Sequence, residues 1–236
     1  MKMLIAVAKA PNGLGARELS KQFNLTLPTT YHVANTLALE GILSKDSAKK
    51  YRLGPGAAAI AHRVDADNQT PCHFSAALHE LARLTGETAY LSGWHNNQIR
   101  VLESVEGAHA VSVADLSKGY ANHLHARASG KVLLAFAQPD FRAKTLEDLE
   151  LPRLTERTIT SKSAFERELA LVRARGVGYD HQEFSAGVDC IAAPIWINGV
   201  VVAALTVSSP SSRFADTETE LLAVLKRAAA RAGAIA

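Results

Sequence analysis

Residues 15–53 read GARELSKQFNLTLPTTYHVANTLALEGILSKDSAKKYRL, and this stretch decides the fold of the N-terminal part of the chain. A first helix is predicted at its start, because Leu19 and Phe23 are spaced to share one helical face. A second helix is predicted from Thr26, a good N-cap residue, to Gly41, where a glycine can end it. Two helices separated by a short turn are therefore expected.

A basic hairpin is predicted to follow these helices. Short apolar-edged segments at residues 42–45 and 51–53 flank the polar, basic tip at residues 46–50. A further helix, over residues 3–10, is predicted ahead of the pair. Helices in this order, followed by a basic hairpin, predict a winged helix-turn-helix over residues 1–54.

The second helix of the pair is the predicted reading helix. Val33 and Leu37 are expected to face inward, which leaves short hydrogen-bonding groups facing outward toward base edges or phosphates. Basic side chains of the hairpin are expected to bind the DNA backbone. The alternative is an ordinary amphipathic helix with a polar outer face. The residues expected to contact DNA are Arg17, Pro28, Thr29, Thr30, Tyr31, His32, Asn35, Lys49, Lys50 and Arg52.

Charge is distributed unevenly along the chain. Residues 1–63 carry nine Lys and Arg against three Asp and Glu, a balance of +6, and the remainder carries 17 against 20, a balance of −3. A basic segment joined to a mildly acidic body is typical of a polyanion-binding module with a separate partner domain. The alternative is a solvated, lysine-rich surface.

Composition argues against several classes of protein. Of the 236 residues, 47% are hydrophobic and 21% are charged, so a packed core is expected rather than disorder. The longest apolar run, at residues 200–207, is too short to cross a bilayer, and no leader for secretion is expected. The two cysteines, Cys72 and Cys190, do not suggest a disulfide scaffold, so a cytoplasmic setting is expected.

The remainder of the chain is predicted to form a linker and an α+β domain. Gly54-Pro55-Gly56 ends the first module, residues 55–70 are expected to form a linker helix and joint, and residues 71–236 alternate between helix and strand patterns. The predicted helices cover residues 74–84, 129–137 and 141–149, with one more opened by a capping box at Ser163 and Glu166 and closed by Gly176, and a last one capped by Asp216. The predicted strands cover residues 88–94, 99–105, 111–113, 190–197 and 200–208, with hairpin turns at Asn96-Asn97 and Asn198-Gly199.

Several phrases of the sequence resemble the IclR family. In the N-terminal part they are LSKQFNL (19–25), TYH (30–32), LALEGIL (37–43) and YRLG (51–54). In the body they are HARASGKVLLA (125–135), GYDHQEF (178–184) and GVDCIAAPI (187–195). Together they span nearly the whole chain. Members of that family usually carry more chain before the first helix, so we expect this first helix to be short or the start to be misassigned.

The resemblance implies that residues 71–236 form a GAF-like effector-binding domain, which in that family binds small metabolites, often carboxylates or aromatic acids. The implied pocket is floored by the sheet and edged by the helix that starts near Ala128, where backbone N–H groups would favour an anion without a basic side chain. The effector-binding residues expected on this basis are Ala128, Ser129, Gly130, Asp180, Val188, Asp189, Cys190, Thr206 and Ser208.

Structural explanations stay open for most of these residues. Cys190 could be a buried structural thiol, since a free cysteine behaves as a small hydrophobe. Gly130 could simply allow tight packing. Thr206 and Ser208, alternate residues of one strand, could be satisfied within the sheet, and Asp180 could cap a turn.

An enzyme is the competing class. Cys190 with a histidine suggests a thiol nucleophile, and Asp180 could orient a base, but no nucleophile-elbow phrase or paired-acid motif surrounds them. His123 and His125 lie two residues apart, yet no complete Cys and His set has the spacing of a structural zinc site. We therefore expect no enzyme, no cofactor and no metal site.

These observations together predict a ligand-responsive, DNA-binding transcriptional regulator, either a repressor or a dual regulator of a small-molecule catabolic operon. The expected partners are double-stranded operator DNA, a small acidic or aromatic effector, and further copies of the chain in a homodimer or homotetramer, with no membrane. The alternative is a small-molecule-binding or oligomerisation protein whose DNA-binding domain is degenerate.

Overall fold

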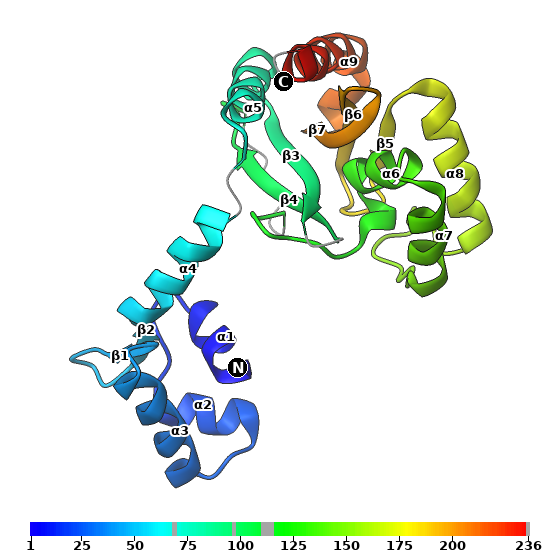
Figure 1. Cartoon of the computed structure of the whole chain (residues 1–236). Helices are drawn as coiled ribbons and strands as arrows, with labels where there is room; N and C mark the ends of the chain where they lie inside the picture. The colour runs from blue at the N-terminus through cyan, green and yellow to red at the C-terminus, as the bar shows by residue number, and fades with distance from the viewer. Residues whose placement is uncertain (68–69, 96–97, 110–115, 235–236) are drawn as a thin grey trace. The chain divides into compact units, whose positions relative to one another are not determined.

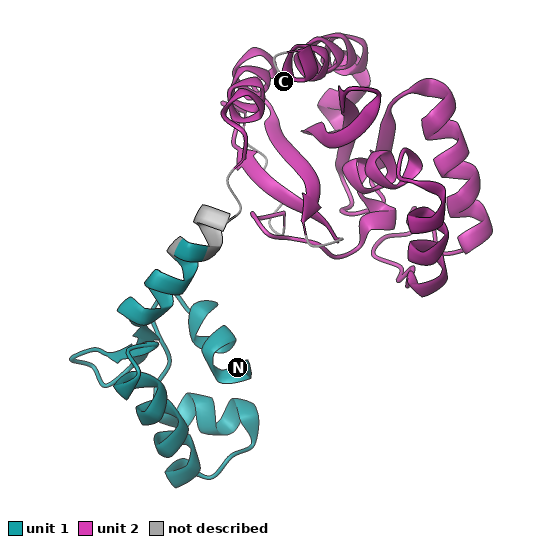
Figure 2. Cartoon of the chain, viewed as in Figure 1, with its two compact units in different colours: residues 1–69 teal, residues 70–236 magenta. Residues whose placement is uncertain are grey.

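The computed structural model describes residues 1–67, 70–95, 98–109 and 116–234. The chain divides into two compact units, Met1–Gln69 and Thr70–Ala236 (Figure 2). Each unit has its own hydrophobic core, so each is described by itself. The expected turn at Asn96-Asn97 and the expected strand at residues 111–113 fall outside the described residues.

The first unit has the expected order of helices and hairpin (Figure 1). Its elements are α1 (Lys2–Ala8), α2 (Ala16–Phe23), α3 (Leu27–Leu39), β1 (Leu43–Lys45), β2 (Tyr51–Leu53) and α4 (Pro55–Asp67). At the start of α3, the Thr26 hydroxyl accepts the Thr29 N–H at 3.3 Å. Asn24, at φ +50, ends α2 in the left-handed region. The two strands pair antiparallel, so the prediction of a winged helix-turn-helix is confirmed.

The buried face of α3 is rotated from the predicted one. The expectation that Val33 faces inward is wrong, because its side chain is 37% exposed while Ala34 is fully buried. Thr30, Ala34 and Leu37 are spaced at i, i+4 and i+7, so they form one stripe along the helix. Leu37 packs partly buried against the core of this unit, as expected. Thr30 therefore belongs to the core side of the helix.

The second unit contains a five-stranded antiparallel sheet in the order β4-β3-β7-β6-β5 (Figure 1). The strands are β3 (Thr88–His95), β4 (Gln98–Val105), β5 (Gly178–His181), β6 (Val188–Ile197) and β7 (Val200–Pro210). The predicted hairpin at Asn198-Gly199 is confirmed, since both residues have positive φ, +49° and +77°, as a type I′ turn requires. The sequence pattern does not predict β5, a four-residue edge strand that pairs with β6.

Alternate residues of the strands enter two separate cores, one on each face of the sheet. On β6, Ile191 lies in the core with α5 and α9, whereas Cys190 and Ala192 lie in the core with α6 and α8. The helices of this unit are α5 (Cys72–Thr85), the short 3₁₀ helix η1 (Leu124–Ala126), α6 (Ala128–Ala135), α7 (Pro139–Asp148), α8 (Lys162–Arg175) and α9 (Ser211–Ala234). Helices on both sides of an antiparallel sheet confirm the predicted α+β class.

Two helix starts differ from the prediction. The cap of α8 is Ser161, whose Oγ accepts the Ala164 N–H at 3.3 Å, and not Ser163. Ser161 has the extended backbone that an N-cap needs, whereas Ser163 already lies inside the helix. Helix α9 begins at Ser211, so Asp216 lies within it and does not cap it.

Ser161→Ala should lower the free energy of unfolding by about 1 kcal/mol, because the Ala164 N–H loses its cap. Ser163→Ala is the matched control and should change it by less than about 0.5 kcal/mol. Urea unfolding followed by circular dichroism measures both values. Equal losses in the two variants would contradict the assignment of the cap.

Three further features of the described residues bear on function. Both cysteines are free thiols, with Cys72 exposed and Cys190 buried. No helix in the described part of the chain is long and apolar enough to cross a membrane. The same residues contain no cluster of three His, Cys, Asp or Glu that could hold a metal ion.

Candidate functional site

The outer face of α3 presents polar side chains to solvent. Tyr31 is 41% exposed, and Pro28, Thr29 and His32 are exposed beside it on the first turns of the helix. Arg17 is exposed on α2. A helix that offers such groups over its first turns can insert them into the major groove of DNA.

Two residues expected to contact DNA form hydrogen bonds within the first unit, the buried Thr30 and the exposed Asn35. Thr30 is fully buried, and its hydroxyl donates to the Thr26 carbonyl at 3.0 Å. Asn35 accepts a hydrogen bond from the Tyr51 hydroxyl at 2.8 Å, which ties α3 to β2. The expectation for Thr30 is therefore corrected: its side chain supports the fold and does not reach the surface.

The carboxylate of Asp46 organises the tip of the hairpin. It accepts the Arg52 Nε–H and the Lys50 backbone N–H, both at 2.9 Å, and these bonds, the one from Arg52 foremost, hold the pKa of Asp46 below its usual value. Arg52 also donates to the Pro11 carbonyl at 3.1 Å, so its guanidinium braces the hairpin. Lys49 is exposed at the tip, at φ +60. Of the basic residues expected to bind DNA here, Lys49 and Arg52 are exposed and Lys50 is partly buried, and the Arg52 side chain is the one held by Asp46 and the Pro11 carbonyl.

Lys45 connects the hairpin to the reading helix, and sequence reasoning missed it. Its ammonium lies 5.4 Å from the ring centroid of Tyr31 and 5.2 Å from that of Tyr51. Cation–π attraction at these distances helps to fix the Tyr31 side chain. No local pattern reveals this contact, because it requires β1 and β2 to be folded against α3.

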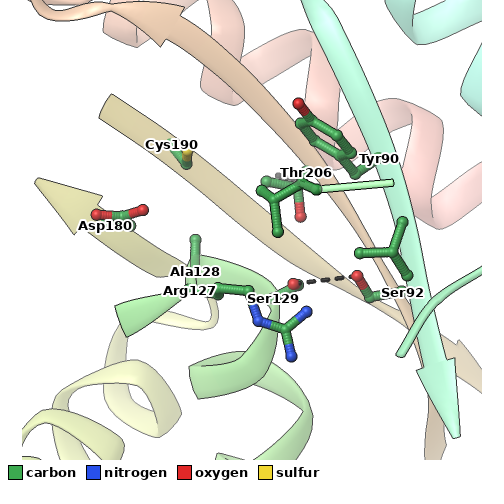
Figure 3. Close-up of a pocket in the computed structure, with 10 residues that line it drawn as sticks. Tyr90, Ser92, Arg127, Ala128, Ser129, Asp180, Cys190 and Thr206 are labelled. Atoms are coloured by element: carbon green, nitrogen blue, oxygen red, sulfur yellow. Dashed lines mark hydrogen bonds between the residues drawn. The ribbon is translucent and has the colours of Figure 1, made fainter. Parts of the chain in front are cut away.

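The second unit holds a small cavity on the α6 side of the sheet (Figure 3). The residues that line it are Tyr90, Ser92, Val101, Leu116, Arg127, Ala128, Ser129, Asp180, Cys190 and Thr206. All five strands and the start of α6 contribute to this lining. Of the residues expected to bind the effector, the fold brings together Ala128, Ser129, Asp180, Cys190 and Thr206.

The cavity is nearly closed in this structure. Its volume is about 10 Å³, which is room for about one water molecule. Pockets that hold small organic ligands typically have at least about 300 Å³. The Ser92 hydroxyl donates to the Ser129 hydroxyl at 3.1 Å, so a hydrogen bond joins β3 to α6 across this space (Figure 3). A metabolite can enter only if the lining side chains move apart.

The other four residues expected to bind the effector do not line the cavity. Val188 packs in the core with α6, and the carboxylate of Asp189 bonds His181 Nδ1 at 2.9 Å. The hydroxyl of Ser208 lies 3.1 Å from the Cys190 thiol. Gly130 lies against η1, where a Cβ would come within 2.2 Å of the Leu124 carbonyl oxygen. Direct contact between any of these four residues and an effector stays a prediction.

Asp180 is the titratable carboxyl group of the cavity. Burial raises its pKa to about 7, although Lys131 and the N–H groups of Glu183 and Phe184 act in the opposite direction. These two N–H groups donate to Asp180 Oδ1 at 2.7 Å and 3.2 Å. Burial, followed by the nearby Asp180, raises the pKa of the Cys190 thiol well above its usual value. The thiol is therefore protonated at neutral pH, which disfavours a nucleophilic role.

A buried ionic network holds α6 in place behind the cavity. Lys131 is fully buried, and its ammonium bonds the Glu183 carboxylate and, at 2.8 Å, the Tyr179 carbonyl. The Glu168 carboxylate lies 3.9 Å from the same ammonium. One cation thus joins α6 to β5, to α8 and to the segment after β5.

Sequence reasoning missed half of the cavity lining: Tyr90, Ser92, Val101, Leu116 and Arg127. The alternation along β3 offers a signal for two of them, because Ala89 and Leu91 enter the core with α5 and Tyr90 and Ser92 must then face the other way. Arg127 carries a weaker signal, a single cation just before a predicted apolar helix.

A winged helix-turn-helix in one unit and an α+β unit with a small buried cavity in the other are the architecture of ligand-responsive transcription regulators. The model of the family domain described as "Bacterial transcriptional regulator IclR C-terminal" matches residues 72–233, and that of the "IclR helix-turn-helix domain" matches residues 1–47. The chain belongs to the IclR family.

Characterised relatives agree with this assignment. The regulator BhcR of Paracoccus denitrificans is 32% identical over 220 residues, covering 90% of this chain and 76% of that protein. The regulator KdgR of Escherichia coli is 32% identical over 220 residues, covering 92% and 83%. These relatives are transcriptional regulators, which confirms the expectation that the chain is not an enzyme.

Solved structures share the fold. The IclR protein of Thermotoga maritima superposes with a TM-score of 0.81 at 26% identity, covering 98% of this chain and 94% of that one. An IclR homolog of Microbacterium hydrocarbonoxydans, solved in complex with 4-hydroxybenzoate, has a TM-score of 0.78 at 24% identity, covering 99% and 95%.

Proposed function

We propose that this chain is a cytoplasmic regulator of a small-molecule catabolic operon, a repressor or a dual regulator whose affinity for its operator changes when a small acidic or aromatic effector binds. The observation that carries the proposal is the exposed polar face of α3 in a chain whose other unit encloses a small cavity with a few polar groups in its lining. A relative from Streptomyces griseus, 30% identical over 236 residues, is named a glycerol operon regulatory protein, which supports the operon assignment.

DNA would be bound by a homodimer, or by a homotetramer made of dimers. Two copies of α3 would then enter successive turns of the major groove. The exposed Pro28, Thr29, Tyr31 and His32 would meet bases or phosphates, and Arg17 would contact the DNA backbone beside them. The exposed Lys49 supports a contact between the hairpin and the phosphates.

The effector would bind in the cavity between α6 and the sheet. Ser129, Asp180, Cys190 and Thr206 give it a few placed polar groups among apolar ones, as small-ligand sites usually have. The start of α6 adds the positive end of a helix dipole. The complex of the Microbacterium hydrocarbonoxydans homolog with 4-hydroxybenzoate shows that a protein of this fold takes an aromatic acid.

A mobility shift on the DNA upstream of its own gene tests the proposal. The full chain should bind that DNA with a dissociation constant far below that for unrelated DNA of the same length, and co-purified small acids identified by mass spectrometry should change this affinity. Equal affinity for the two DNAs would favour the alternative of a small-molecule-binding or oligomerisation protein whose DNA-binding domain is degenerate. If the chain instead turned over a metabolite and did not bind its upstream DNA, the proposal that it is a transcription regulator would be wrong.

The double variant Lys49→Ala with Lys50→Ala should weaken binding to every DNA sequence by about tenfold or more. If each lysine meets one phosphate, the slope of log affinity against log salt should flatten by about 2. The matched control is Lys144→Ala with Lys226→Ala, two exposed lysines of the second unit. Fluorescence anisotropy across a salt series measures the DNA affinity of both variants. An unchanged slope in the Lys49 and Lys50 variant would contradict a contact between the hairpin and the DNA phosphates.

A further inference from the structure

Arg127, the residue just before α6, carries a buried cation that the fold leaves almost without partners. It is only 3% exposed, and its Nε and Nη1 atoms have no hydrogen-bond partner among the described residues. Its Nη2 atom reaches two carbonyl oxygens, those of Ile99 and Ala121, at the long distance of 3.4 Å each. The guanidinium carbon lies 5.4 Å from the ring centroid of Tyr120.

Two other cations of the same unit, the fully buried Lys131 and the partly buried Arg213, are paired with carboxylates. Lys131 bonds Glu183, and Arg213 forms a two-pronged bond with Glu87 at 2.5 Å and 2.9 Å. Arg127 has no carboxylate within salt-bridge distance in the part of the chain that the structure describes. Burial lowers the pKa of Arg127 to about 10, so the guanidinium still carries its charge at neutral pH. A buried charge without a counter-ion lowers the stability of the folded state, so an anion that pairs with Arg127 would stabilise the protein.

The unpaired guanidinium belongs to the cavity. Arg127 lines it, and in Figure 3 the guanidinium lies next to the hydrogen-bonded hydroxyls of Ser92 and Ser129. The hydroxyl of Thr206, which lines the same cavity, is also buried without a partner. Asp180 lies well apart from the guanidinium, toward the other side of the lining residues in the same view. The cavity thus has a cationic side, and a side where a carboxyl group discourages any second negative charge.

We propose that Arg127 anchors the carboxylate of the effector and makes this regulator selective for compact monocarboxylates that carry a hydroxyl or carbonyl group at the other end. Each free donor, Nε or Nη1, forms a planar fork with Nη2, whose own hydrogen bonds to carbonyl oxygens are long, and such a fork binds a carboxylate through two parallel hydrogen bonds. The uncharged polar end faces Thr206 and Asp180. This inference rests on the proposed function, because it assigns the effector to this cavity.

The selectivity follows from the charges on the two sides of the cavity. A monocarboxylate supplies the counter-ion that Arg127 lacks and leaves the Asp180 side uncharged. A dicarboxylate of the same length places its second charge toward Asp180, whose ionised form it repels. A neutral amide of the same shape leaves the guanidinium unpaired. The number of negative charges on a ligand, more than its size, should therefore determine its affinity for this site.

Formate and formamide are suitable probes, because they are small, nearly equal in shape and different in charge. Thermal unfolding of the full chain is followed in increasing sodium formate or formamide, with sodium chloride holding the ionic strength constant. Formate should raise the melting temperature of the wild type, and formamide should not. The dissociation constant for formate should be about 10 to 100 times weaker in Arg127→Met and intermediate in Arg127→Lys. An equal response to formate in wild type and Arg127→Met would overturn the proposal.

The stability of the variant without any probe gives a second test. Arg127→Met removes an unpaired buried charge and keeps most of the side-chain volume, so its melting temperature should equal or exceed that of the wild type. A fall of several degrees would show that Arg127 serves the fold and would overturn its assignment to the ligand. Acetate and malonate test the selectivity, which would be overturned if malonate bound as tightly as acetate.

The mobility shift on upstream DNA separates this proposal from the proposed function. Wild type and Arg127→Met should both bind the DNA, since Arg127 is not part of the reading unit. If neither protein binds the DNA while formate still raises the melting temperature of the wild type but not of Arg127→Met, the proposed function is wrong and the anion site is supported. If both bind and formate acts equally on both, the anion site is overturned and the regulator stands.

Discussion

Gly130→Ala should destabilise the second unit by roughly 3 kcal/mol, although alanine is the better helix former. Gly130 lies in α6 and has no positive φ, so helix propensity alone predicts a gain of about 1 kcal/mol. A Cβ at this position would come 2.2 Å from the Leu124 carbonyl oxygen and 2.8 Å from its carbon. Both atoms are backbone, so η1 and α6 must separate to admit the methyl group. A lower free energy of unfolding in Gly130→Ala would therefore show that packing against η1 outweighs helix propensity at this position, and a higher one would show the reverse.

Urea unfolding monitored by tryptophan fluorescence measures this effect in the second unit alone, because both tryptophans, Trp94 and Trp196, lie there. Gly176→Ala is the matched control. Gly176 has open space around its missing Cβ but a φ of +73, so only the left-handed backbone opposes alanine there, at a cost of about 1 kcal/mol. A Gly130→Ala protein as stable as the wild type would show that η1 does not press on α6.

Asp180→Asn should remove a pH dependence from the stability of the second unit. The asparagine oxygen can still accept the N–H groups of Glu183 and Phe184, so the turn that they form is retained. The groups that act on Asp180 are Lys131 on α6, Glu183 in the following turn and Cys190 on β6. The variant removes the ionisable group and leaves these neighbours in place.

The direction follows from the pKa of about 7 in the folded protein against the usual 3.8. Between these values the folded state binds more protons than the unfolded state, so the contribution of Asp180 is complete below pH 4 and is lost as the pH rises through 7. The wild type should therefore lose roughly 2–3 kcal/mol relative to Asp180→Asn between pH 5 and pH 8. Urea unfolding at both pH values measures this difference. Asp148→Asn, at an exposed site, should show no such trend. If the difference in free energy of unfolding between wild type and Asp180→Asn were the same at both pH values, Asp180 would not have the raised pKa on which this prediction rests.

Elements set by neighbouring residues could be predicted from the sequence. The Thr26 cap, the Asn198-Gly199 turn and the end of α8 at Gly176 each depend on the backbone preferences of one or two residues. Strand β5 lies at the other extreme, since Gly and Asp disfavour strands and its four residues pair only because the edge of β6 is there to receive them. Local signals thus fix caps and turns, and distant partners fix edge strands.

The candidate site was harder to predict for the same reason. The family resemblance pointed to the residues around Ser129 and Cys190, five of which the fold brings together. Thr30 looked like a surface residue because polar side chains usually are, and only the packing of α3 shows that its hydroxyl is used by the Thr26 carbonyl. The partners of Arg127 come from positions 99, 120 and 121, so no pattern local to α6 could reveal its isolation.

The nearly closed cavity has a consequence for the rates and populations of effector binding. When only a small fraction of molecules is open, the apparent dissociation constant is the intrinsic one divided by that fraction, so an open population of about 1% weakens binding about a hundredfold. Association then proceeds no faster than opening allows, and the complex, once closed, dissociates slowly. Such a sensor averages over brief fluctuations in metabolite level and responds to sustained ones.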